Sequence, residues 1–394
     1  MRNSGCKKAL LYIIISTLMI FVGSNPVYAQ NEDNSFTERR IMEQKLDTGE
    51  IKLVEGIVDD VLHHADMYNI TAEDILKSTL NGSPMENLKG IPKVIFSLLG
   101  KEIRANLSLI FRMYSIILLG ALLRCLQPFQ SGIPNVIAKF AVNGVIILSA
   151  SVSFGSIVDI ASTTIGSLQS IASVVMPALI ALMASSGQIV SVGAIQPVML
   201  IGVNIACQIF KNILLPLAVM AGLLFLVDSI TERFKLKNLA KLFKSCAVWI
   251  TGVLTLMFSV LVSVQKIASS SVDAVALKTT RFAIGTFVPV AGKYMADAAD
   301  TIMQCALAVR NAAGLLTIIG LVIICIIPFI KVFIIMFALK LTAAIGAPVC
   351  DEAVCDALEE ATGCLSVVLG IMGASLFVLI LLTGALMNSG GLLK

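Results

Sequence analysis

The chain has 394 residues, of which 57% are hydrophobic and 14% are charged, and its mean hydropathy is +0.92. Soluble globular domains have about 25% charged and about 45–50% apolar residues, so this composition excludes an ordinary soluble protein. The formal net charge of +4 is dispersed along the chain and does not indicate a nucleic-acid partner. Because residues 1–104 hold 12 basic and 14 acidic side chains, a polar N-terminal segment precedes an apolar, membrane-embedded body.

Residues 1–29 have the pattern of a secretory signal peptide. A basic start is followed by a predominantly apolar stretch of fourteen residues, Ala9–Val22, shorter than the roughly 20 that cross a bilayer, and then by Val27-Tyr28-Ala29. The pattern predicts cleavage after Ala29, and the alternative is an uncleaved anchor. In both cases residue 30 begins on the extracytoplasmic side.

Residues 30–105 are predicted to form an extracytoplasmic amphipathic helical segment. Apolar residues recur at helical spacing between Ile41 and Leu62. Thr71 and Asp74 predict a capping box that opens a second, short helix ending at Leu80. One narrow apolar stripe cannot form a core by itself, so we expect this segment to rest on the membrane body or on a partner.

Residues 106–394 are predicted to form an all-α, polytopic membrane domain with about 6–8 membrane helices, some of them short or re-entrant. Hydropathy and helix breaks place spans at Leu107–Leu126, Val136–Ile160, Leu168–Ala184, Ile189–Phe210, Ile213–Val227, Cys246–Lys266, Gly314–Leu339 and Cys364–Met387. One ungapped shift aligns Pro177 with Pro289, Gly202 with Gly314, and Pro216 with Pro328. These matches indicate an internal repeat of residues 163–230 in residues 275–342.

A cluster of cations sets the expected orientation of the spans. Five basic residues fall within a short stretch: Arg233, Lys235, Lys237, Lys241 and Lys244. Short loops rich in Lys and Arg stay cytoplasmic, so we expect this basic loop in the cytoplasm. If residue 30 is extracytoplasmic, five membrane crossings before the basic loop also place that loop in the cytoplasm. Three crossings give the same result, if residues 168–184 are re-entrant and residues 197–228 form one span.

Two groups of polar side chains interrupt the apolar body, each spaced to lie on one face of a helix. They are Lys293, Asp297, Asp300 and Gln304 in one group, and Asn204, Gln208 and Lys211 in the other. Charges in hydrocarbon are costly, so both groups are candidates for a pore lining or a subunit interface. For the first group, the alternative is an interfacial helix whose polar face meets water. The isolated charges Asp159, Asp228 and Arg310 are expected at span ends.

Catalytic motifs are absent from the sequence. It contains no P-loop, HExxH, GxSxG or CxxC motif. Asp297 and Asp300 share one helix, whereas an aspartyl dyad needs carboxylates from separate segments. We therefore expect no enzyme activity, no cofactor and no metal site.

Residues 281–300 (RFAIGTFVPVAGKYMADAAD) resemble the signature of the stage III sporulation protein AE family. Gly120-Ala-Leu-Leu-Arg124, the signal peptide, the chain length and the order of segments fit the same family. The resemblance implies a non-enzymatic membrane subunit of the secretion-like sporulation channel complex that links mother cell and forespore. Such a subunit is needed for forespore development and late forespore gene expression.

The resemblance also implies partners and a location. The partners are membrane lipid, the other stage III A-operon proteins including an AAA-type ATPase, and stage II sporulation protein Q, and a homo-oligomer is left open. The location is the mother-cell membrane around the forespore, with residues 30–105 on the intermembrane side. The alternative function is a stand-alone secondary transporter that uses Lys293, Asp297 and Asp300 around a midplane site.

Overall fold

The computed structural model describes residues 49–64, 71–80, 133–229, 236–287, 292–346 and 352–388, with six isolated helical positions between 100 and 115. All of them belong to one compact unit, Met42–Lys394. The regular structure of these residues is entirely helical, and five helices are long and apolar enough to cross a membrane. The predicted all-α polytopic class is therefore confirmed. Ala29 and most of the predicted span Leu107–Leu126 lie outside the described residues.

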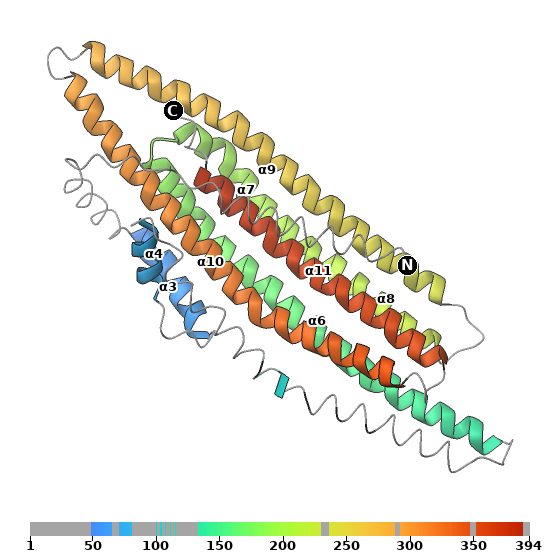
Figure 1. Cartoon of the computed structure of the whole chain (residues 1–394). Coiled ribbons are helices and arrows are strands. Elements are labelled where there is room, and N and C mark those ends of the chain that lie inside the picture. Colours follow the sequence, from blue (N-terminus) through green and yellow to red (C-terminus); the bar gives the residue numbers. More distant parts are fainter. Residues whose placement is uncertain are drawn as a thin grey trace. The chain divides into compact units, whose positions relative to one another are not determined.

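The long helices lie in the C-terminal two thirds of the chain (Figure 1). The helices, in chain order, are α3 (Gly49–His64), α4 (Ala72–Leu80), α6 (Ile133–Ser185), α7 (Ile189–Ile209), the π-helix η3 (Phe210–Leu214), α8 (Leu215–Asp228), α9 (Lys237–Phe287), α10 (Gly292–Gly346) and α11 (Glu352–Asn388). The helices α6, α9 and α10 contain 53, 51 and 55 residues, well above the roughly 20 that a bilayer requires.

Two breaks expected from the sequence, after Ile160 and after Phe210, are not present. The residues between the predicted spans Val136–Ile160 and Leu168–Ala184 form part of α6, where the Thr164 hydroxyl donates a hydrogen bond to the Ile160 carbonyl at 2.7 Å. Such back-bonding lets Ser and Thr continue a helix within an apolar environment. Pro177 also lies inside α6. The predicted short spans are thus segments of longer continuous helices.

The turn between α6 and α7 occurs instead at Ser186–Gln188. Gly187 has a φ of 81°, in the left-handed region that glycine adopts without strain. The Gly187 N–H donates to the Ala184 carbonyl at 3.0 Å, and the Gln188 N–H donates to the Met183 carbonyl at 3.4 Å. This is a Schellman ending, which satisfies the last carbonyl groups of α6 and reverses the chain.

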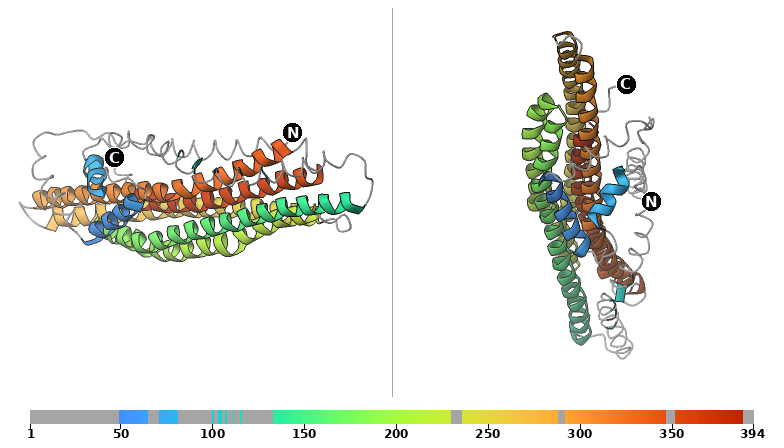
Figure 2. Two further views of the ribbon diagram at one scale, coloured as in Figure 1. Left: turned by 90° about the horizontal axis from the view of Figure 1, so that it is seen from below. Right: turned by 90° about the vertical axis from the view of Figure 1, so that its left-hand side faces the viewer.

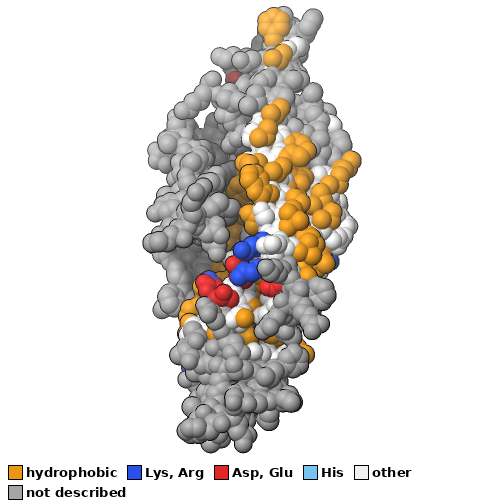
Figure 3. All heavy atoms as spheres, turned by 90° about the vertical axis from the view of Figure 1, so that its right-hand side faces the viewer, with side chains coloured by type: hydrophobic (Ala, Val, Ile, Leu, Met, Phe, Trp, Pro, Cys, Tyr) orange, Lys and Arg blue, Asp and Glu red, His pale blue; other side chains and the backbone are white. Residues whose placement is uncertain are grey.

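The central helix is α11, which packs against α6, α8, α9 and α10 and has the most buried span. The least buried span belongs to α9. Its exposed apolar side chains include Leu242, Trp249, Val253, Leu256, Met257, Val260 and Val264. On the face of the molecule drawn in Figure 3, hydrophobic side chains cover much of the described surface, and charged side chains gather in one group. An apolar surface of this kind suits contact with lipid tails.

Glycines let the helices approach closely. The Phe154 ring of α6 lies directly over Gly222 of α8, and Met387 of α11 lies directly over Gly314 of α10. A side chain at either glycine would collide with its neighbour, which is the usual reason for small residues between membrane helices.

The N-terminal helices α3 and α4 pack on the long helices, as their single apolar stripe led us to expect (Figure 2). The buried side chains Ile51, Val54, Val58 and Leu62 face α6 and α10. The predicted start of α4 is confirmed, and Thr71 caps it. The Thr71 hydroxyl lies 2.6 Å from Asp74 Oδ2, and the Asp74 N–H donates to Thr71 Oγ1 at 3.3 Å.

Candidate functional site

The predicted group Asn204, Gln208 and Lys211 lies on one side of α7 and η3, next to polar residues of α6. The structure adds three residues that the spacing argument did not include, and we name the whole set the mid-span polar face: Gln169, Ser170, Asn204, Gln208, Lys211 and Asn212. Four of these side chains are exposed, while Gln169 and Lys211 are partly buried. The face therefore lies on the outside of the described helices.

Hydrogen bonds and a close packing contact fix the polar face. Gln169 Nε2 donates to Asn204 Oδ1 at 2.9 Å, which joins α6 to α7. Asn212 Nδ2 donates to Gln208 Oε1 at 2.5 Å, one turn apart. Lys211 Nζ lies over Gly166 of α6, where a Cβ atom would be only 3.3 Å away. Because Gly166 has no side chain, the Lys211 ammonium group fits against α6.

A wide helical turn sets the direction of Lys211. The residues of η3 form a π-helix, in which the Leu215 N–H donates to the Phe210 carbonyl. Pro216 follows, and it has no N–H to donate to the preceding turn. This missing donor accounts for the widening. Single π-turns inside α-helices are found frequently at functional sites.

The polar face lies within a candidate membrane span. Asn204, Gln208, Lys211 and Asn212 belong to the span Ile201–Asp228. A charged side chain at the centre of a membrane helix costs about 2.5–3.5 kcal/mol on insertion scales. Protein or water, rather than lipid tails, must therefore contact this face in a membrane.

The other predicted group lies near the start of α10 and does not join the polar face. Asp297 and Gln304 are exposed, Asp300 is partly buried, and the side chain of Lys293 is outside the described set. These residues lie in the first four turns of α10.

The separation of the two groups follows from one hydrogen bond between α10 and the α6–α7 turn, Arg310 to Gln188. Antiparallel packing of α6 with both helices makes α7 and α10 run in the same direction from this level. Asp300 lies ten residues before it, about 15 Å, and Asn204 lies sixteen residues after it, about 24 Å. The two groups therefore cannot form one site.

Three of the five predicted loop cations are part of a helix. Lys237, Lys241 and Lys244 lie on the first turns of α9, whereas Arg233 and Lys235 lie outside the described residues. The Lys237 N–H donates to Asp228 Oδ1 at 3.0 Å, so this carboxylate caps the start of α9. Asp228 is the last residue of α8, as expected for a charge at a span end.

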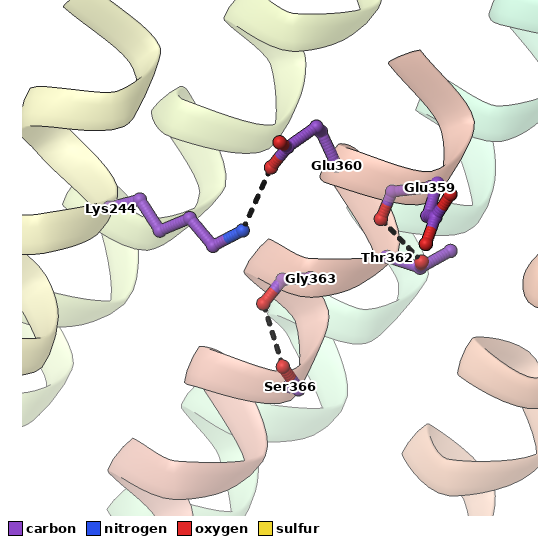
Figure 4. Close-up of polar contacts among 6 residues, drawn as sticks. All are labelled: Lys244, Glu359, Glu360, Thr362, Gly363 and Ser366. Carbon is purple, nitrogen blue, oxygen red and sulfur yellow. Dashed lines mark hydrogen bonds and ion pairs between the residues drawn. The ribbon is translucent and has the colours of Figure 1, made fainter. Parts of the chain in front are cut away.

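Lys244 forms an ion pair that ties α9 to α11 (Figure 4). Its Nζ lies 3.1 Å from Glu360 Oε2, and both side chains are partly buried. The same Nζ lies 5.6 Å from the centroid of the Phe225 ring of α8. Gly363 leaves room for it, since a Cβ there would lie 2.5 Å from Nζ. One basic residue thus holds three helices together.

Arg310 is a buried residue whose role the sequence did not reveal. It is 1% exposed and lies inside α10. Its Nη1 donates to Gln188 Oε1 at 2.7 Å and contacts Ser186 Oγ at 3.4 Å. Its Nη2 donates to the Met387 carbonyl at 2.7 Å. The guanidinium therefore joins the ends of α6 and α11.

The surroundings of Arg310 explain why a buried cation is tolerated. The C-termini of α6 and α11 both point at it, and helix C-termini carry a partial negative charge. Asp159 is an exposed residue in the middle of α6. A lone charge in an apolar run was the only sequence signal available for either residue.

Comparisons with known proteins agree with the signature at residues 281–300. Residues 70–390 match the family model described as stage III sporulation protein AE. A curated protein of that name from Bacillus subtilis (strain 168) is 28% identical over 353 residues, which cover 86% of this chain and 88% of the relative. No solved structure matches.

Proposed function

Because the chain belongs to the stage III sporulation protein AE family, which acts in sporulation, we propose that it is a non-enzymatic membrane subunit of a channel complex. This secretion-like complex links mother cell and forespore and supports forespore development and late forespore gene expression. The chain lies in the mother-cell membrane around the forespore. Its proposed partners are the other stage III A-operon proteins, including the AAA-type ATPase, and stage II sporulation protein Q.

The observation that carries the proposal is the mid-span polar face. Hydrocarbon is a poor environment for Lys211 and for the four carboxamides beside it. In a protein that worked alone, these polar side chains on the outer surface would contact lipid tails and would not stabilise the protein. A subunit of an assembly gains a polar contact or a polar lining for a passage.

The orientation proposed for the subunit follows from the helix connections. The helix α6 and the continuous helix α7–η3–α8 supply two crossings, and the predicted span Leu107–Leu126 supplies one before them. Three crossings from an external residue 30 bring the basic residues near Lys241 to the cytoplasm, where an ATPase would dock. Helices α3 and α4 then lie on the intermembrane side, where they are accessible to partners from the forespore.

The stand-alone transporter has less support than the channel subunit. Its expected site uses Lys293, Asp297 and Asp300, which lie near the start of α10 and do not join the polar face. We therefore propose no second function.

The experiment that tests the proposal uses the native spore-forming host. The gene is deleted, and a fluorescent reporter is driven from a late forespore-specific promoter. We expect the deletion to abolish reporter expression after engulfment and the wild-type gene to restore it. Normal reporter expression in the deletion strain would refute the proposed function.

A matched pair of substitutions tests the role of the polar face in the same strain. Lys211→Leu changes the face, whereas Lys340→Leu makes the same chemical change at an exposed position near the end of the α10 span. We expect Lys211→Leu to reach the membrane at wild-type levels but to restore the reporter poorly. Lys340→Leu should restore it fully. Equal restoration by both variants would contradict a role for the face.

A further inference from the structure

A row of exposed side chains on α9 changes from polar to apolar along its length. The row consists of Lys241, Ser245, Trp249, Val253 and Leu256, and all five side chains are exposed. Steps of four and three residues keep them on one side of the helix. The row therefore lies on the outer surface of the described helices, where its change in polarity reflects a change in the surroundings.

The charged residues of α9 indicate where the helix enters and leaves the hydrocarbon. No charged residue occurs between Lys244 and Lys266, and this stretch of 21 residues is about 31 Å long. That length matches a hydrocarbon layer of about 30 Å. One boundary of the layer therefore lies near Ser245. Lys241 lies about 6 Å outside this boundary, within the headgroup layer, and Trp249 lies about 6 Å inside it.

Trp249 independently supports this boundary. It is the sole tryptophan of the chain, and it is 71% exposed. An exposed indole is favourable where its apolar body meets acyl chains and its N–H meets the polar headgroups. Helical side chains tilt towards the N-terminus of their helix, which brings the Trp249 ring closer to Ser245. Its position thus agrees with the boundary obtained from the charges.

The cations at the start of α9 differ in their partners. Lys244 pairs with Glu360, and Asp228 accepts the Lys237 N–H. Lys241 is exposed and forms no ion pair with another described residue. Its ammonium group is therefore available to an external anion. At the depth of the headgroups, the anion that a membrane supplies is a lipid phosphate.

We propose that Lys241 and Trp249 form a binding surface for an anionic phospholipid headgroup. The Lys241 ammonium binds the phosphate, the Trp249 ring lies at the level of the glycerol esters, and Val253 and Leu256 contact the acyl chains. A zwitterionic headgroup binds less well, because its own cation competes with Lys241 for the phosphate. The inference goes beyond the proposed function, since it requires only that α9 crosses the membrane.

Quenching of tryptophan fluorescence by brominated lipids tests the depth of Trp249. The purified full-length protein is placed in phosphatidylcholine vesicles whose acyl chains carry bromine either near the headgroup or near the methyl end. All tryptophan emission comes from Trp249. We expect the shallow bromine to quench more strongly than the deep one. In a control with Trp249→Phe and Leu256→Trp, the indole lies about 10 Å deeper on the same side of α9, so the order should reverse.

The same emission reports which lipid lies beside Lys241. Shallow-brominated phosphatidylglycerol and phosphatidylcholine are compared at equal mole fractions, and quenching gives their relative binding constant. We expect the wild type to prefer phosphatidylglycerol. Lys241→Gln should lower this preference by about fivefold, equivalent to about 1 kcal/mol for one basic residue near an anionic surface. Lys241→Arg retains the charge and should retain the preference.

The outcomes separate this inference from the proposed function. Equal or weaker quenching of Trp249 by the shallow bromine would refute the assigned depth. A wild type without lipid preference, or a preference unchanged in Lys241→Gln, would refute the headgroup site. Loss of reporter expression in the deletion strain would then still support the channel-complex role. Lipid preference that depends on Lys241, together with a normal reporter in the deletion strain, would instead support the headgroup site and refute the proposed function.

Discussion

Replacing Arg310 with methionine should destabilise the protein strongly. Methionine keeps most of the side-chain volume but removes both short hydrogen bonds, to Gln188 Oε1 and to the Met387 carbonyl, each 2.7 Å long. Hydrogen bonds to charged groups contribute about 1.5–3 kcal/mol each, so the loss should be roughly 3–6 kcal/mol. The weaker 3.4 Å contact with Ser186 adds little. The Gln188 acceptor left behind is buried, which supports a loss above the lower end of that range.

The measurement is thermal or denaturant unfolding of the purified full-length protein in nanodiscs, followed by tryptophan fluorescence. Arg310→Lys retains the charge but can reach fewer acceptors, so it should fall between the wild type and Arg310→Met. Lys340→Met serves as the control, because Lys340 is exposed on α10. An Arg310→Met protein within about 0.5 kcal/mol of the wild type, the range of ordinary surface substitutions, would refute the structural role assigned to this residue.

Three further predictions concern other parts of the structure. Glu360→Gln should cost about 1 kcal/mol, because its pair with Lys244 is partly exposed, and a double-mutant cycle of the two residues should show coupling of that size. Thr71→Ala should weaken α4 locally by about 0.5–2 kcal/mol, seen as faster hydrogen exchange of its first turn, and unchanged exchange would contradict the cap. The pKa of Glu55 is raised above 4.5 by burial and then by nearby carboxylates, so the folded chain binds its proton more tightly. Stability should therefore fall as pH rises from 4.5 through the raised pKa, and Glu55→Gln should flatten this dependence in melts between about pH 4 and 7.

Much of the fold follows from local patterns in the sequence. Hydropathy predicts the membrane class, and the spacing of Thr71 and Asp74 predicts the start of α4. The spacing of Asn204, Gln208 and Lys211 predicts a shared helix face, and the structure places them on one side of α7 and η3. These predictions succeed because each depends on residues within three turns of one another.

The remaining features depend on tertiary contacts or on the membrane environment. Residues near Thr164 resemble a break by hydropathy, but their hydroxyls bond to their own helix and continue it. Gln169 belongs to the polar face only because α6 lies beside α7, 35 residues further along the chain. Arg310 is recognisable only when two helix ends, at Gln188 and Met387, converge on it. No spacing rule within a single helix contains that information.

The length of the longest helices has a mechanical consequence. At about 1.5 Å per residue, α6, α9 and α10 are each about 75–80 Å long, whereas the hydrocarbon layer is about 30 Å thick. Even when such a helix is tilted by about 40°, the upper limit seen for membrane helices, only about half of its length lies within the hydrocarbon layer. The rest of each helix extends into water. A soluble protein that binds this part contacts the same helix that crosses the bilayer, and Pro177 in α6 and Pro328 in α10 are the points at which such a helix can bend.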